Sequence, residues 1–178
     1  MVTRRKFLQH AGIATGAILL NPFDTMAGKA NHKIGLQLYS LNKEIRNDTI
    51  KAVLKKVSAA GYKAVETYGY SKSGKFWGLS PADFKQVLID NNLITTSGHY
   101  GLDDYLRPNG SDEVIKSYIE AASLSGQTYI TVPFMSDNIR ETTDAYKAIA
   151  AKLNKAGEMC KASNLKIAYH NHDFEFFP

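Results

Sequence analysis

Five short apolar runs at intervals of roughly 30 residues constrain the fold of this chain more than any other feature. Each run has the length and character of a buried β-strand, and an amphipathic stretch separates it from the next. Strands and helices that alternate in this way are typical of parallel βαβ units. The predicted strands are residues 34–39, 64–68, 93–99, 129–134 and 165–172.

The intervening stretches carry the signals of helices. In the first of them, apolar residues recur at the i, i+3, i+4, i+7 spacing of a buried helix face, namely at Ile50, Val53, Leu54 and Val57. We predict Asn47 or Asp48 as the N-cap of this helix and Gly61 as its end. Ser80 before Pro81 predicts an N-cap followed by proline at the first helical position. Further helices are predicted over residues 111–123 and 142–160.

Two α/β architectures fit this order: an open doubly wound sheet, or part of a (β/α)8 TIM barrel. A glycine-rich phosphate-binding turn does not follow the first predicted strand, where an open dinucleotide-binding sheet would carry it. Polar residues instead cluster near the ends of several different strands, which is typical of a barrel. An open sheet would gather them at one switch point. The pattern therefore favours the barrel.

The chain is short for a complete barrel. A typical (β/α)8 barrel has about 250 residues, whereas residues 31–178 form a segment of 148. We therefore expect a barrel truncated after its fifth strand, which is a fragment or the product of an interrupted gene. Five strands without closure leave two open sheet edges, and these favour pairing with another copy in a homo-oligomer, or aggregation.

The first 30 residues have the composition of an export signal. Arg4, Arg5 and Lys6 precede an uncharged run over residues 11–20, which is too short to span a bilayer. Small residues follow, and residues 28–30 have the small-x-small form of a cleavage site. The segment resembles a twin-arginine signal, and this resemblance implies a periplasmic protein that folds before export. A frayed N-terminal helix and a retained membrane anchor are the alternatives.

Removal of this signal changes the charge of the chain. The whole sequence has 22 basic and 17 acidic residues, but residues 1–30 hold four of the basic residues and one acidic residue. Residues 31–178 therefore carry 18 basic and 16 acidic residues, which is too balanced to favour nucleic acid as a partner. No membrane span is expected in this part. The single cysteine, Cys160, excludes an intramolecular disulfide and is expected to be a small buried residue.

The fifth predicted strand carries the sharpest chemical signal. His170 and His172 alternate along it, so both imidazoles face the same way. Two imidazoles at the end of a strand suit proton transfer or binding of a divalent metal. The alternative is structural, with one histidine hydrogen-bonded in the core and the other facing solvent.

Four other strand ends and loops supply further candidates. Glu66 shares a face with Tyr68, and as a carboxylate among apolar neighbours it is either a contact to a ligand or half of an internal ion pair. Gln37, Tyr39 and His99 are candidates to bind polar groups of a ligand, although a packing role is open for Tyr39 and a core role for His99. Aromatic residues after the second strand are candidates to stack on a ligand or to cap the barrel, namely Phe76 and Trp77.

Several of these motifs resemble those of one family. Residues 35–40 (GLQLYS) and 169–176 (YHNHDFEF) are similar to the first and fifth strands of the sugar phosphate isomerase/epimerase family, which are xylose isomerase-like TIM barrels. Residues 61–66 and 97–99 are similar to the family's second and third strands. The resemblance covers about residues 33–178 and implies a sugar isomerase or epimerase of carbohydrate metabolism. The ligand groups that the candidate residues contact would then be the hydroxyls and the ring of a sugar.

The resemblance also implies a cofactor and a mechanism. A divalent metal (Mn, Mg, Zn or Co) would polarise the substrate carbonyl, and a base would remove the neighbouring proton to give an enediolate. The family's usual ligands are a glutamate, an aspartate, a histidine and a second glutamate from strands five to eight. His170 stands where the first glutamate is expected, and the other ligands would lie beyond Pro178.

The sequence leaves other functions open. A keto-sugar lyase or dehydratase fits the same barrel, and so does a non-catalytic carbohydrate-binding barrel or an inactive fragment. An endonuclease of the same superfamily is disfavoured by the charge balance. Because phosphorylated sugars are mainly cytoplasmic, the export signal makes an unphosphorylated sugar the expected small-molecule substrate.

Overall fold

The computed structural model describes residues 34–71 and 73–176. The predicted twin-arginine signal over residues 1–30 lies outside these ranges. Within them, no helix is long and apolar enough to cross a bilayer.

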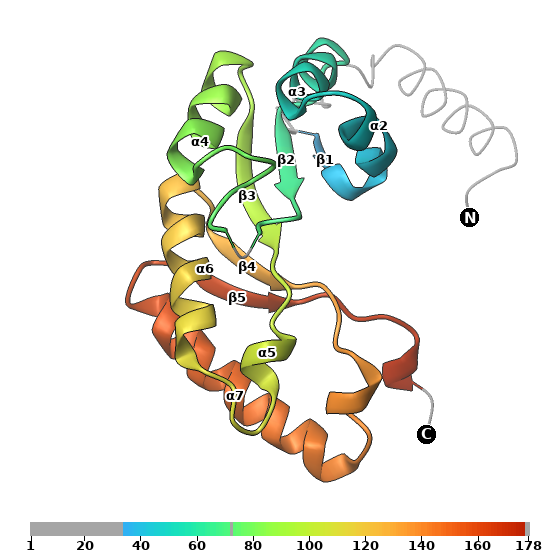
Figure 1. Cartoon of the computed structure of the whole chain (residues 1–178), viewed down its shortest axis with the longest axis vertical. Helices are drawn as coiled ribbons and strands as arrows, with labels where there is room; N and C mark the ends of the chain where they lie inside the picture. Colours follow the sequence, from blue (N-terminus) through green and yellow to red (C-terminus); the bar gives the residue numbers. More distant parts are fainter. Residues whose placement is uncertain (1–33, 72, 177–178) are drawn as a thin grey trace, which may run out of the picture. The chain divides into compact units, whose positions relative to one another are not determined.

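The core of the fold is one parallel sheet in which five strands lie in chain order (Figure 1). Each strand pairs with the next in parallel, so Gln37 lies opposite Glu66 and Thr131 lies opposite Ala168. This sheet confirms the predicted series of βαβ units. The strands are β1 (Gly35–Gln37), β2 (Ala64–Thr67), β3 (Ile94–His99), β4 (Tyr129–Val132) and β5 (Lys166–Tyr169).

A long helix follows each of the first four strands, and these helices return the chain to the start of the next strand (Figure 1). They are α3 (Ile50–Ala59), α4 (Pro81–Asp90), α6 (Asp112–Ser125) and α7 (Thr143–Lys161). Shorter helices interrupt the loops at the carboxyl ends of the strands. These are η2 (Leu38–Leu41), α2 (Asn42–Asn47), α5 (Asp103–Leu106), η3 (Asp137–Ile139) and η4 (Phe174–Phe176).

The predicted N-cap of the first long helix was wrong by one or two residues. Thr49, not Asn47 or Asp48, caps α3, because its hydroxyl oxygen accepts from the Ala52 N–H at 3.2 Å. The cap is displaced because the short helix α2 ends at Asn47 and Asp48 adopts an extended conformation. Helix α3 therefore starts later than predicted. Ser80 caps α4 as predicted, with its hydroxyl oxygen accepting from the Asp83 N–H at 3.1 Å.

The hydrophobic core lies between the sheet and the long helices. Val65, Ile130 and Val132 point from the strands toward this core and are buried with the apolar faces of the helices. The opposite face of the sheet is open, since Ile94 and Tyr129 are 43% and 37% exposed. In a closed (β/α)8 barrel this second face is the packed interior. The described residues thus form four βα units and a fifth strand, consistent with part of such a barrel.

Candidate functional site

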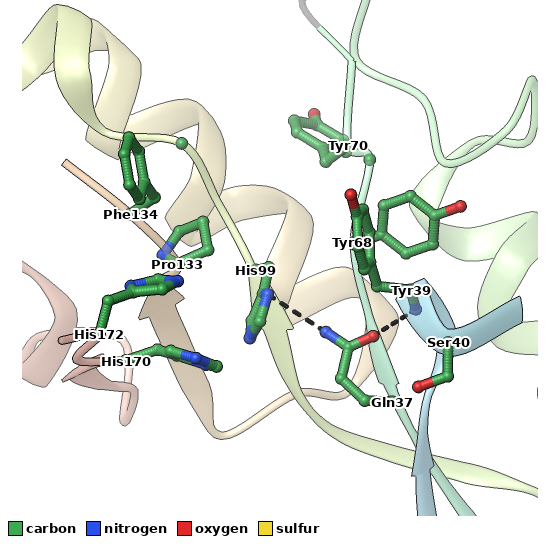
Figure 2. A pocket seen from close by; sticks show the side chains of 12 residues that line it. Gln37, Tyr39, Ser40, Tyr68, Tyr70, His99, Pro133, Phe134, His170 and His172 are labelled. Carbon is green, nitrogen blue, oxygen red and sulfur yellow. Dashed lines mark hydrogen bonds between the residues drawn. The ribbon is translucent and has the colours of Figure 1, made fainter. Parts of the chain in front are cut away.

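A pocket of about 620 Å³ opens at the carboxyl ends of the strands (Figure 2). Every strand contributes to it, through its last residue or the loop that follows. Ligand pockets typically combine apolar walls with a few convergent polar groups, and this pocket has both. Its lining residues are Gln37, Tyr39, Ser40, Tyr68, Gly69, Tyr70, His99, Gly101, Pro133, Phe134, His170 and His172.

A chain of hydrogen bonds crosses the floor of the pocket from β1 to β3. The Tyr39 backbone N–H donates to Oε1 of Gln37, which leaves Nε2 of Gln37 to donate to Nδ1 of His99 at 3.1 Å (Figure 2). With Nδ1 accepting, Nε2 of His99 carries the proton and faces Oε2 of Glu66 at 3.3 Å. The orientation of the Gln37 amide therefore sets the tautomer of His99.

Glu66 lies at the end of this chain as an ionised acceptor. Its second oxygen accepts from the Ser97 hydroxyl at 2.7 Å. The hydrogen bond from His99 is the strongest influence on Glu66, and it holds the pKa of this carboxyl below its ordinary value of 4.5 although partial burial opposes the shift. A carboxylate with both oxygens occupied in this way orients His99 and is not a proton donor at neutral pH.

A buried polar network supports β3 directly behind His99. Tyr100 donates to Oε1 of Gln127 at 2.8 Å, and Nε2 of Gln127 donates to the Thr67 hydroxyl at 3.0 Å. Burial raises the pKa of Tyr100, so its phenol stays protonated. Gly98 makes room for the network, because a Cβ there would lie 2.4 Å from Oγ1 of Thr67.

The three histidines of the pocket lie together. The rings of His170 and His172 are 4.9 Å apart and tilted by 32°, and the His99 ring meets His170 edge-on at 5.3 Å. The His170 N–H donates to the Val132 carbonyl at 3.0 Å, which extends the β4–β5 pairing by one residue. His170 is exposed on the pocket surface, so its imidazole is free to meet a ligand.

Aromatic side chains form the wall opposite the histidines. Tyr39 is 63% exposed and packs edge-on against Tyr68 at 5.3 Å. Trp77 packs edge-on behind Tyr68 at 5.2 Å and adopts a positive φ of 46°. The flat faces of such rings suit the C–H-rich face of a sugar. The sequence left two roles open for Phe76, stacking on a ligand or capping the barrel. Phe76 is fully buried, so its role is structural.

The structure brings together five of the seven predicted site residues: Gln37, Tyr39, His99, His170 and His172 all line the pocket. Glu66 is not among the lining residues and reaches the pocket through His99. Trp77 supports Tyr68 from behind. The functional roles assigned to these seven residues remain predictions.

Other lining residues were not predicted from the sequence. Phe134 and Pro133 follow β4, and Tyr70 follows β2. Tyr68 was noted only as a neighbour of Glu66 on the same strand face. Their positions just after strand ends are the one signal that marks them, since a barrel builds its site from those loops.

The residues present do not assemble a metal site on their own. Within residues 34–71 and 73–176, no group of three or more histidine, cysteine, aspartate or glutamate side chains is placed to hold a metal ion. The predicted ligand His170 therefore belongs to no such group among these residues, and the predicted divalent cofactor needs further ligands that they do not supply.

Comparison with known proteins identifies the family. The model of the xylose isomerase-like TIM barrel family matches residues 54–178. This chain therefore belongs to the xylose isomerase-like TIM barrel family. No curated protein matches the sequence significantly.

Two similar solved structures are sugar phosphate isomerase/epimerases from Parabacteroides distasonis. One is 29% identical with a TM-score of 0.69, and the match covers 80% of this chain and 52% of that one. The other is 31% identical with a TM-score of 0.64, covering 80% of this chain and 56% of that one. The chain thus spans about half the length of these structures.

A probable 3-DHS dehydratase of petrobactin synthesis from Bacillus anthracis shares the fold. It is 14% identical with a TM-score of 0.60, and the match covers 79% of this chain and 52% of that one. At this identity the likeness extends to the fold alone.

Proposed function

We propose that this protein is an isomerase or epimerase that acts on an unphosphorylated sugar or keto-sugar outside the cytoplasm. The observation that carries the proposal is the pocket itself. Its hydrogen-bonded polar floor faces an accessible histidine on one side and an aromatic wall on the other. Membership of the xylose isomerase-like family and similarity to two sugar phosphate isomerase/epimerases support the same class of substrate.

The polar floor would bind and orient the sugar. Gln37 and His99 are locked by their mutual hydrogen bond and by Glu66, so their positions are fixed before a ligand arrives. Such preorganisation lowers the cost of holding a substrate in a reactive geometry. Tyr39 and Tyr68 would cover the apolar face of the sugar ring, as aromatic side chains do.

His170 is the group best placed to move a proton. Imidazole both accepts and donates protons near neutral pH. In the proposed reaction, a ring nitrogen of His170 takes the proton from the carbon beside the substrate carbonyl, and the C–H electron pair moves into an enediolate. The proton on His170 exchanges with solvent. Delivery of a solvent proton to the opposite face of the same carbon gives epimerisation. Delivery of a proton to the neighbouring carbon, with the hydroxyl proton passing from one enediolate oxygen to the other, gives isomerisation.

These steps use only the chain's own side chains. Within residues 34–71 and 73–176, no group of three or more histidine, cysteine, aspartate or glutamate side chains is placed to hold the divalent metal that the family resemblance implies.

The test is exchange of substrate hydrogen with solvent. The purified protein is incubated in D₂O with a panel of unphosphorylated aldoses, ketoses and keto-sugars, and products are analysed by NMR and mass spectrometry. We expect deuterium at the carbon beside the carbonyl, together with an epimer or isomer. Loss of water from the product would indicate a dehydratase instead. Binding without exchange or turnover would contradict the proposal in favour of a carbohydrate-binding barrel.

A further inference from the structure

Glu175 closes the turn that follows β5 and is not among the residues of the pocket. One of its carboxylate oxygens accepts a hydrogen bond from the Tyr169 hydroxyl, and the other accepts from the His172 backbone N–H at 2.9 Å. The two donors flank His170 in the sequence. The carboxylate therefore ties the segment that carries both pocket histidines into a closed turn.

The charges around this turn suit such a bridge. Burial opposes ionisation of Glu175, yet the hydrogen bonds from Tyr169 and His172 keep the pKa of this carboxyl below its ordinary value. Burial, followed by the neighbouring carboxylate, raises the pKa of Tyr169, so the phenol keeps its proton and donates it. A hydrogen bond to an ionised acceptor is stronger than one between neutral groups.

Aromatic contacts hold the ring of His172 in one plane. Phe174 stacks on it at 5.6 Å with an interplanar angle of 10°, and Phe134 meets it edge-on at 5.4 Å. The Arg140 guanidinium covers the Phe174 ring at 3.5 Å, and Nε of Arg140 donates to the Met135 carbonyl at 3.0 Å. The β4 loop and the β5 turn thus clamp this imidazole together.

The two nitrogens of the clamped ring differ. Nδ1 of His172 is buried and has no hydrogen-bond partner within the described part of the chain, while the residue lines the pocket. A buried N–H without an acceptor is a costly and rare arrangement. The neutral ring therefore carries its proton on Nε2, the nitrogen left to meet a ligand, and His172 offers the pocket a hydrogen-bond donor.

We propose that Glu175 is a positioning residue, which holds the turn through Tyr169 and the His172 amide so that Nε2–H of His172 donates to the oxygen of a bound carbonyl substrate. The proposal rests on the proposed function and adds a division of labour to it. His170 moves the proton, and His172 stabilises the negative charge that develops on the oxygen, as fixed donors do in enzymes that form enolates.

Three variants test this role: Glu175→Ala, Glu175→Gln and Tyr169→Phe, with Glu120→Ala as a control at an exposed glutamate of the outer helix α6. The amide of Glu175→Gln can still accept from the His172 N–H and donate to the Tyr169 oxygen, so it preserves both bonds. Each protein is labelled with ¹⁵N. The exchange rate of the His172 amide and the ¹⁵N shifts of its ring are measured without substrate, and kcat and KM are then measured on the substrate found by exchange.

We expect the His172 amide of Glu175→Ala to lose its protection from exchange. The kcat of this variant should fall about 100-fold, which is the scale of loss that a misplaced group can cause, and its KM should be nearly unchanged. Glu175→Gln should retain both properties, Tyr169→Phe should fall between, and Glu120→Ala should match the wild type. The ring shifts of the wild type should show protonation at Nε2.

Two results would overturn the proposal. One is an Ala variant with unchanged amide protection and ring shifts. The other is a Gln variant that keeps the protection but loses as much kcat as the Ala variant, because the carboxylate would then act chemically. The NMR measurements need no substrate, so they decide whether Glu175 holds the turn even if the protein has no isomerase activity. Absence of that activity would contradict the proposed function.

Discussion

Gln37 satisfies both of its neighbours with only one orientation of its amide. Oε1 must accept from the Tyr39 N–H, so Nε2 must donate to His99. This one residue therefore transmits the backbone geometry after β1 to the tautomer of a histidine on β3, and from there to Glu66. Within residues 34–71 and 73–176, no side-chain hydrogen bond of this kind fixes the His170 ring, and the residue is exposed on the pocket surface. Proton transfer is therefore proposed for His170.

The ionised state of Glu66 predicts a pH-dependent contribution to stability. Because the pKa of Glu66 is lower in the folded protein than its ordinary value of 4.5, its contribution is fully present above about pH 4.5. It is lost as the pH falls through the folded-state pKa. Glu66→Gln should therefore lower the free energy of unfolding at pH 7, and this difference from the wild type should shrink at pH 3.5. Urea unfolding at both pH values measures it. A difference that is equal or larger at pH 3.5 would contradict the assignment.

Gly98 predicts a packing effect next to His99. In Gly98→Ala, the new Cβ would lie 2.4 Å from Oγ1 of Thr67 and 2.8 Å from Oε1 of Gln127. Overpacking of this kind typically costs about 1–3 kcal/mol of stability. Gly101→Ala is the matched control, because a Cβ there meets nothing within 4 Å. Urea unfolding should show a lower free energy of unfolding only for Gly98→Ala. Equal free energies of unfolding for the two variants would contradict the tight packing of Thr67 and Gln127 around Gly98.

At the scale of whole elements, the sequence predicted all five strands and the four long helices, because each has a clear apolar period. The short helices α2 and α5 were missed, since segments of six and four residues are too short to show a period. The same limit explains the displaced cap of α3. The buried bridge from Tyr100 through Gln127 to Thr67 was also beyond prediction, because its two hydrogen bonds join residues 27 and 60 apart in the chain.

The candidate site was predictable to the extent that its residues end strands. Gln37 and His99 end their strands, and the fold brings them together in one pocket with His170. His170 and His172 were predicted inside the fifth strand, but β5 ends at Tyr169 and both histidines lie in the loop that follows it. The contact of Glu66 with His99 was not predictable, because it depends on a register shift between β2 and β3 at Val65 and Glu66. Periodicity does not reveal such an irregularity.

Helix α7 offers a chemical probe of its own packing. Cys160 is fully buried in this helix, and burial raises the pKa of its thiol to about 11. Because the thiolate is the reactive form, we expect almost no reaction with a disulfide reagent such as DTNB at pH 8 in the native protein. Addition of urea should expose one thiol per chain. Rapid modification without denaturant would contradict the packing of α7 against the sheet.

At the scale of the whole molecule, five parallel strands give a site at one end of the sheet and leave the second sheet face open. The pocket draws on all five strands or the loops that follow them, so its geometry depends on the full series rather than on one loop. The family match and the two isomerase/epimerase structures are consistent with this arrangement.

The proposed export route gives a prediction for the whole protein. Residues 1–30 fused to a fluorescent protein that folds in the cytoplasm should direct it to the periplasm of a bacterium with twin-arginine transport. Changing both Arg4 and Arg5 to lysine should keep it in the cytoplasm with little change in charge. Cell fractionation measures the distribution. Export of the double-lysine variant, or retention of the unchanged fusion, would contradict the route.

The central claim is that His170 moves a proton beside a sugar carbonyl. The most direct measurement is the rate of deuterium incorporation from D₂O into the substrate by the wild type and by His170→Gln, which keeps a polar side chain but cannot act as the base. Removal of a general base typically costs 10²- to 10⁴-fold in rate. We predict a loss in this range with substrate affinity largely retained, and exchange by His170→Gln at the wild-type rate would contradict the claim.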